Sequence, residues 1–169
     1  MIKVVVVVCA AILLAGCGTV NYVPQEYVIS AERIPNFDVN GSVLVQNIQT
    51  DQEQRKFFSG AADWTGDYKT VTDHLVMQLN KEIAIHGKVI GRDKKKVLQV
   101  KVVQLAAVQH AFHFTSSMQV NVKLGDGAET TVRVSQGSPS DMWRVLNGTL
   151  ALGVIDILKD PKVKAYLAN

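Results

Sequence analysis

The sequence predicts an α+β fold, a two-layer sandwich in which two main helices cover one face of an antiparallel sheet of about four to five strands. Residues 68–86 and 138–157 carry apolar side chains at helical spacing. Residues 98–102, 118–124 and 132–134 alternate apolar and polar side chains instead. Such alternation is typical of strands that are buried on one face only, and helices packed on that face complete two layers.

The first strand and the first helix are expected in the first half of the folded region. Residues 41–48 are rich in β-forming side chains and predict a strand. A polar and aromatic loop is expected over residues 50–67, followed by the helix at residues 68–86. Gly87 stands where a helix C-cap favours a left-handed residue. The buried stripe of this helix is expected to be Val71, Leu75, Val76, Leu79 and Ile83.

The second half of the chain is expected to form an antiparallel meander and then the last helix. The turn Gly-Asp-Gly at residues 125–127 is a short link, and short links favour antiparallel neighbours. A short extra strand near residues 88–90 is the alternative that adds a strand to the sheet. Ser138 can cap the last helix, Pro139 suits its first position, and Asp141 favours the positive end of its dipole.

The N-terminus has the form of a signal peptide. Lys3 is followed by an apolar run from Val4 to Leu14. This run is shorter than the roughly 20 apolar residues that a helix needs to cross the hydrocarbon core of a membrane. A positive start, a short apolar centre and small residues at the end are typical of a secretory signal.

The end of this segment, Leu14-Ala15-Gly16-Cys17, resembles the lipobox of bacterial lipoproteins at every position. In that family the cysteine thiol receives a diacylglycerol, the leader is removed before the cysteine, and the new amino group is acylated. The resemblance therefore implies that residues 1–16 are a signal peptide and that Cys17 carries the lipid. Several acyl chains anchor a protein firmly. An ordinary secretory signal with a chance cysteine is the alternative.

Removal of the leader is expected to leave a single domain with one cysteine. The other cysteine, Cys9, lies inside the leader, so no intrachain disulfide is expected. Residues 17–40 include two prolines and show no sustained helical period, so they are expected to be the lipidated N-terminus and a tether. Residues 41–169 are expected to be a single α+β domain.

The expected location is the outer membrane, facing the periplasm. In the lipoproteins of Gram-negative enterobacteria, an aspartate directly after the acylated cysteine favours retention in the inner membrane. Gly18 occupies that position here, so resemblance to this sorting pattern favours the outer membrane. The basic run at residues 92–96 could also touch anionic headgroups, although a charged turn between strands is the favoured interpretation.

From Cys17 to its end, the chain resembles a broad group of small Gram-negative lipoproteins, which includes YajG-like proteins and the auxiliary lipoproteins of ABC transporters. The shared features are the lipidated cysteine, a strand, a helix such as TDHLVMQLNKEIAIHG, a hairpin region and a last helix ending near LKDPKVKAYL. Some members work with machines that move lipids between membranes. The resemblance implies the fold, the location and a protein partner in the cell envelope, without naming that partner.

The sequence favours a binding function over an enzymatic one. It has no G-x-S-x-G, Walker or Rossmann glycine pattern, and its net charge of +3 is too small and scattered for a nucleic-acid-binding protein. We therefore expect an interaction module that docks on a cell-envelope complex and needs no cofactor. The alternative is a carrier that holds a lipid or another apolar ligand between the sheet and the helices.

Four aromatic side chains gather in the loop before the first helix and at the first residue of that helix, and they are the candidate partner-binding residues. Large aromatic side chains in a loop can be the anchors of an interface. They can equally fold back and cover the edge of the sheet, which is the favoured interpretation. The four are Phe57, Phe58, Trp64 and Tyr68.

The histidines do not predict a metal site. His110 and His113 are three positions apart in an expected strand, so their side chains should point to opposite faces. His74 and His86 lie about 120° out of register on the expected helix. Glu82 and His86 could supply two ligands one turn apart, but two ligands do not make a zinc site.

Replacing Cys17 by Ser or Ala should block acylation and normal lipoprotein processing, because the thiol is the group that receives the diacylglycerol. Incorporation of labelled palmitate into the wild-type protein and the variant measures this directly. If the variant still incorporates the label at the wild-type level, the assignment of the lipid anchor to Cys17 is wrong.

Overall fold

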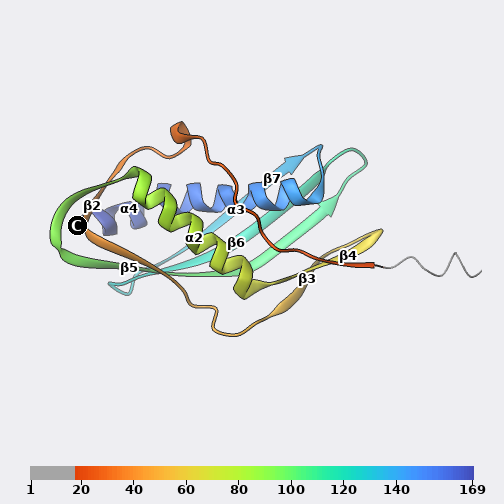
Figure 1. Cartoon of the computed structure of the whole chain (residues 1–169), viewed down its shortest axis with the longest axis horizontal. Helices are drawn as coiled ribbons and strands as arrows, with labels where there is room; N and C mark the ends of the chain where they lie inside the picture. The colour runs from red at the N-terminus through yellow and green to blue at the C-terminus, as the bar shows by residue number, and fades with distance from the viewer. Residues whose placement is uncertain (1–17) are drawn as a thin grey trace, which may run out of the picture.

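A computed structural model describes residues 18–169 of the chain, apart from the side chains of residues 92 and 93. The expected signal peptide and the expected acylation site, Cys17, lie outside the described residues. Within the described range the chain forms two sheets and three α-helices (Figure 1). The α+β class expected from the sequence is confirmed, whereas the arrangement of the strands differs from a single antiparallel sheet.

The larger sheet is mixed rather than wholly antiparallel. Its strand order is β2 (Phe37–Asn47), β5 (Gly87–Gln109), β6 (Phe114–Leu124) and β7 (Glu129–Ser138). The strands β5, β6 and β7 are antiparallel neighbours, and they contain the three alternating segments. The strands β2 and β5 are parallel, because the helix α2 (Tyr68–His86) returns the chain to the end of the sheet where β2 began.

A smaller sheet occupies the region where the sequence predicted a loop. Its strand order is β1 (Gly18–Asn21), β4 (Ala62–Asp67) and β3 (Gln54–Ser59). The strands β3 and β4 form a hairpin, and β1 is parallel to β4. The loop prediction was wrong because every residue of β4 except the buried Gly66 is half-buried, so the strand lacks the alternation that marks one buried face.

The two main helices pack on one face of the larger sheet. The helix α2 contacts β2 and β5, whereas α3 (Met142–Lys159) contacts β6, β7 and α2 (Figure 1). A third helix, α4 (Pro161–Ala168), packs near β2 through the buried Val163 and Leu167. The core between the layers includes Val71, Leu75 and Leu79 of α2, Val100, Val120 and Val122 of the sheet, and Leu146, Val154 and Ile157 of α3.

The helix boundaries follow from their caps. The carboxylate of Asp67 accepts hydrogen bonds from the first backbone N–H groups of α2. Asp141 caps α3, and the hydrogen bond from the backbone N–H of Arg144 lowers the pKa of Asp141. Ser138, the expected cap, instead ends β7. Gly87 is not the expected left-handed C-cap, because its φ is −80° and it begins β5.

The residues that precede β2 are part of the fold, although the sequence predicted a tether up to residue 40. Tyr22 and Ile34 are each 1% exposed. The Tyr22 hydroxyl donates to Asn147 Oδ1 at 2.8 Å, and the backbone N–H of Gln25 donates to the same oxygen at 3.1 Å. Burial raises the pKa of Tyr22 above its ordinary value.

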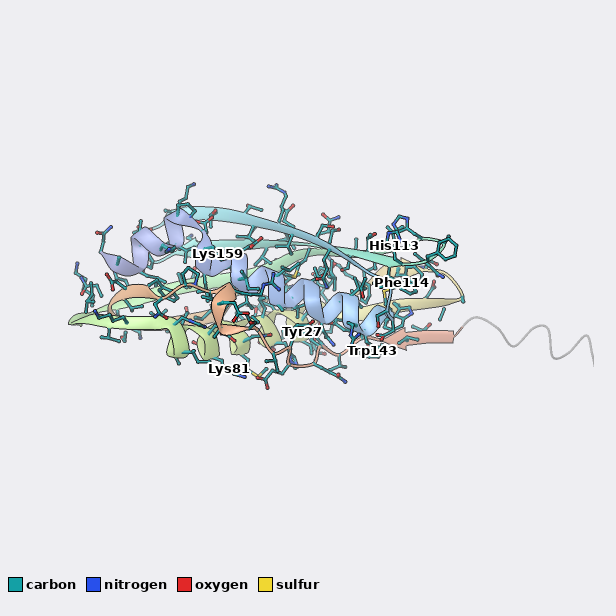
Figure 2. All side chains as sticks on the ribbon, turned by 90° about the horizontal axis from the view of Figure 1, so that it is seen from above. Tyr27, Lys81, His113, Phe114, Trp143 and Lys159 are labelled. Atoms are coloured by element: carbon teal, nitrogen blue, oxygen red, sulfur yellow. The ribbon has the colours of Figure 1, made fainter. Side chains whose placement is uncertain are left out.

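The same segment also contacts the outer side of α2. Lys81 forms an ion pair with Glu26, and the side chain of Gln78 donates to the backbone oxygen of Tyr27 (Figure 2). The prediction of a tether was wrong because the contacts that hold this segment join residues far apart in the sequence, which local periodicity does not register.

A chain that begins at Gly18 should unfold cooperatively, whereas one that begins at Gly41, the boundary expected from the sequence, should not fold stably. The shorter chain loses the buried side chains of Tyr22, Ile34 and Phe37. Each large buried side chain contributes about 1.5–3 kcal/mol, and the sum is comparable with the roughly 5–15 kcal/mol stability of a typical domain. Thermal unfolding followed by circular dichroism compares the two chains. Equal melting temperatures would show that residues 18–40 are dispensable for folding.

Candidate functional site

Two of the four candidate aromatic residues are core residues. Phe57 is 7% exposed and Tyr68 is 3% exposed. The ring of Phe57 meets the ring of Tyr22 edge-on, with 5.8 Å between centroids. For Phe57 and Tyr68 the structure therefore agrees with the favoured interpretation, in which the rings fold back onto the domain and are buried there.

The hydroxyl of Tyr68 completes the hydrogen bonding of β5. The strand β2 stops at Asn47, which lies opposite Val100, while β5 continues beyond that point. At Leu105 the backbone N–H donates to the Tyr68 hydroxyl oxygen at 2.7 Å, and the hydroxyl donates to the backbone oxygen at 3.2 Å. In the same way, the hydroxyl of Thr72 accepts a hydrogen bond from the backbone N–H of Val102. Burial raises the pKa of Tyr68.

Phe58 and Trp64, the other two candidates, are half-buried and join the smaller sheet to the rest of the domain. The ring of Phe58 lies edge-on to Phe114, with 6.4 Å between centroids. The ring of Trp64 lies edge-on to Trp143 of α3, with 5.3 Å between centroids. Both keep part of their surface in solvent, so contact with a partner stays a prediction for Phe58 and Trp64.

The other face of the larger sheet carries polar and basic side chains and no helix from residues 18–169. Along β6 and β7 most side chains of this helix-free face are exposed, whereas most of their neighbours in the sequence are buried or half-buried against the helices. The Thr131 hydroxyl donates to Asn121 Oδ1 at 3.1 Å, and Arg133 Nε donates to Gln119 Oε1 at 3.2 Å. Cross-strand hydrogen bonds of this kind hold the face in a fixed shape.

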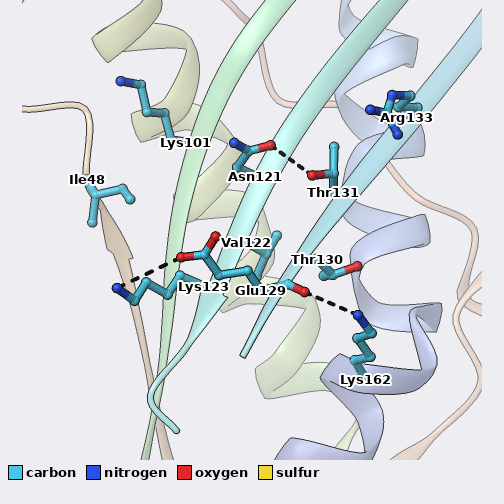
Figure 3. A pocket seen from close by; sticks show the side chains of 10 residues that line it. All are labelled: Ile48, Lys101, Asn121, Val122, Lys123, Glu129, Thr130, Thr131, Arg133 and Lys162. Atoms are coloured by element: carbon cyan, nitrogen blue, oxygen red, sulfur yellow. Dashed lines mark hydrogen bonds and ion pairs between the residues drawn. The ribbon is translucent and has the colours of Figure 1, made fainter. Parts of the chain in front are cut away.

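A shallow hollow of about 440 Å³ lies on this helix-free face (Figure 3). Lys123 Nζ lies 3.9 Å from a carboxylate oxygen of Glu129, an exposed pair, and Lys162 donates to the backbone oxygen of Glu129 at 3.3 Å. Lys101 belongs to none of the ion pairs among the described side chains. The hollow is therefore lined by one carboxylate, that of Glu129, and by four basic side chains, those of Lys101, Lys123, Arg133 and Lys162. This excess of positive charge attracts acidic groups.

The space between α3 and the larger sheet is filled by side chains. The position that a Cβ atom of Gly153 would take is occupied by the methyl group of Met118. At Gly148 the corresponding position is occupied by the side-chain amide of Gln136. The helix lies too close to the sheet here for any larger residue, so this packing leaves no room for an apolar ligand at these positions.

The two histidines near the end of β5 lie together rather than on opposite faces. The rings of His110 and His113 are stacked, with 4.4 Å between centroids and an angle of 11° between planes. The expectation was wrong because these residues form the turn between β5 and β6, where strand alternation does not apply. Within residues 18–169 no group of three or more His, Cys, Asp or Glu side chains is placed to hold a metal ion.

No protein-family model matches this chain, and no curated protein matches it at a significant level. Among the helices of residues 18–169, none combines the length and the apolar composition needed to cross a membrane. The features that bear on function are the helix-free face with its basic hollow and, in the sequence, the segment before Gly18 that resembles a lipobox.

Phe57→Ala should lower the free energy of unfolding by about 3–5 kcal/mol, because it leaves a cavity in the core. The same change at Phe112, which is 89% exposed, is the matched control and should leave the free energy of unfolding almost unchanged. Urea unfolding of the two variants measures both values. Equal stabilities would mean that the ring of Phe57 is not a core element.

Proposed function

We propose that this protein is a lipid-anchored interaction module of the outer membrane that faces the periplasm and docks on a cell-envelope complex. It acts by binding rather than by catalysis. The observation that supports docking best is the basic hollow on the helix-free face. Three antiparallel strands present this face with rigid backbone, and a rigid surface loses little entropy when a partner binds.

The charge of the face indicates the chemistry of the partner. Lys101, Lys123 and Arg133 lie on three neighbouring strands, so their charges reinforce one another over one surface. A face of this kind steers an acidic surface into contact and fixes its orientation. We therefore propose a protein partner that presents Asp and Glu side chains to this sheet. By resemblance to the auxiliary lipoproteins of ABC transporters, the complex is proposed to move lipid.

The lipobox supports the anchored location. Cys17 is joined by one peptide bond to Gly18, the first residue of β1, so acyl chains on Cys17 hold the domain by a folded strand and not by a long tether. The carrier alternative has less support, because the packing of Met118 against Gly153 fills the space that a ligand between the layers needs.

Reversal of two charges should separate docking from folding. The double variant Lys101→Glu, Arg133→Glu changes the helix-free face. The matched control Lys88→Glu, Lys159→Glu makes the same change of net charge at two exposed lysines outside the hollow. A photo-reactive amino acid at Asn121, which lies in the hollow, captures the partner in intact cells.

The first variant should reduce the yield of the crosslinked complex roughly tenfold, because charge complementarity becomes repulsion. The control variant should crosslink as the wild type does, and both variants should melt within a few degrees of it. Equal crosslinking by the two double variants would show that the helix-free face does not dock the partner.

A further inference from the structure

The turn between β5 and β6 exposes an apolar side chain at its tip. Phe112 is 89% exposed, more than any other large apolar side chain in the described part of the chain. The backbone N–H of His110 donates to the backbone oxygen of His113 at 2.8 Å, and the two rings stack. This hydrogen bond and the stacking close the turn, so Phe112 is presented by an ordered hairpin.

This hairpin tip lies at the same end of the molecule as β1 (Figure 1). Gly18 pairs with Ala62, which directly follows the turn of the β3–β4 hairpin. In that turn, Gly60 lines a hollow together with Gln109, the last residue of β5. Figure 2, which views the molecule from a second direction, also shows His113 and Phe114 at this end. The two hairpins and the start of β1 therefore lie at one end of the molecule.

Covalent geometry fixes the distance of the expected acylation site from this end. Cys17 and Gly18 are adjacent in the chain, and consecutive Cα atoms lie about 3.8 Å apart across a trans peptide bond. If Cys17 is acylated, its acyl chains enter the membrane at the end of the molecule that carries the two hairpin tips. A lipid surface then lies within reach of Phe112.

The composition of this end suits a membrane interface. No Lys, Arg, Asp or Glu occurs from Val102 to Val122, and none occurs in residues 18–23 or 57–62. Trp64 and Trp143 lie together, half-buried, with Trp64 on the strand that pairs with β1. Tryptophan is one of the residues that membrane interfaces favour.

The opposite end of the molecule carries a cluster of lysines, whereas the charges nearest to β1, those of Lys56 and Asp63, form an ion pair. The turn that follows β6 adjoins Val97, next to the lysines of residues 94–96. The ammonium group of Lys96 lies 4.8 Å from the centre of the Tyr166 ring, and Lys94 donates to the backbone oxygen of Asn169. These lysines belong to a strand and not to the turn expected from the sequence, and they lie far from β1 (Figure 1).

We propose that the β5–β6 hairpin tip, with Phe112 foremost, inserts to the boundary between the headgroups and the acyl chains of the membrane leaflet that holds the acyl chains of Cys17. The inference rests on the proposed lipid anchor and adds an orientation to it. With the acyl chains and Phe112 as two contacts at one end, the domain stands on the membrane with its lysine-rich end in solvent, and the helix-free face points sideways toward a partner.

The test uses the mature acylated protein in vesicles of phosphatidylethanolamine and phosphatidylglycerol with brominated acyl chains. Because Cys9 is removed and Cys17 is acylated, an introduced cysteine is the only free thiol. A nitrobenzoxadiazole label at Ala111→Cys reports on the hairpin tip, and the same label at Asp126→Cys, in the turn at the other end of β6, is the control. Bromine quenches the label only when it reaches the acyl region.

Quenching should be several-fold stronger at residue 111 than at residue 126. Addition of Phe112→Ser to the Ala111→Cys protein should reduce this quenching, whereas Val28→Ser, at a side chain that is 84% exposed, should not. Equal quenching at residues 111 and 126 overturns the inference, as does quenching that Phe112→Ser leaves unchanged.

Mass spectrometry and flotation with the vesicles separate this inference from the proposed anchor. A protein that carries the acyl mass and floats, but is not quenched at residue 111, keeps its anchor and lacks the membrane contact of Phe112. A protein that has no acyl mass and does not float overturns the proposed anchor and, with it, the inference that depends on it.

Discussion

Tyr22 lies directly after β1 and places its hydroxyl group inside the fold, where it donates to Asn147 Oδ1 on α3. The backbone N–H of Gln25 donates to the same oxygen. A buried amide or hydroxyl group that loses its partner is costly, so these hydrogen bonds hold the N-terminal segment against the helix. The start of β1 is thereby fixed relative to both sheets, and an acyl group on the preceding residue would hold the whole domain in one orientation.

The long strand β5 extends along the molecule and connects the strands of the larger sheet. Its first part pairs with β2 and its last part pairs with β6, and the Tyr68 hydroxyl takes over as hydrogen-bonding partner where β2 has ended. The cation of Arg55, on β3, lies 4.8 Å from the centre of the Tyr68 ring, so the smaller sheet is tied to the same place. Because Tyr68 bonds to β5 and stacks under Arg55 of β3, its side chain joins the larger sheet to the smaller one.

Local patterns in the sequence predicted the parts of this fold that depend on one buried face. The helix at residues 68–86 has the bounds expected from its apolar stripe, and the alternating segments are the strands β5, β6 and β7. The parallel pairing of β2 with β5 was missed because periodicity reports burial and not the neighbour of a strand. Tyr22 and Asn147 gave no signal, since one stands in a segment without a period and the other is a polar residue within a helix.

The candidate site was predictable only in part, for similar physical reasons. The aromatic residues before α2 were visible in the sequence, but their burial depends on the β3–β4 hairpin, which lacks alternation. The basic side chains of the helix-free face come from different strands, and only the sheet brings Lys101, Lys123 and Arg133 together. The stacking of His110 on His113 depends on the turn between β5 and β6. The sequence did not predict this turn, because the residues on both sides of it have the pattern of a strand.

With the proposed acyl anchor and hairpin contact, the domain stands on the membrane by the end that holds β1. The most direct measurement is the height of the turn between β6 and β7, obtained by energy transfer from a donor at Asp126→Cys of the acylated protein to acceptor lipids in the bilayer. Because β6 has 11 residues, each rising about 3.3 Å, an upright domain places this donor on the order of 30 Å above the headgroups. A height of roughly 10 Å, the spacing of one packed layer, would mean that the domain lies flat and would contradict the account.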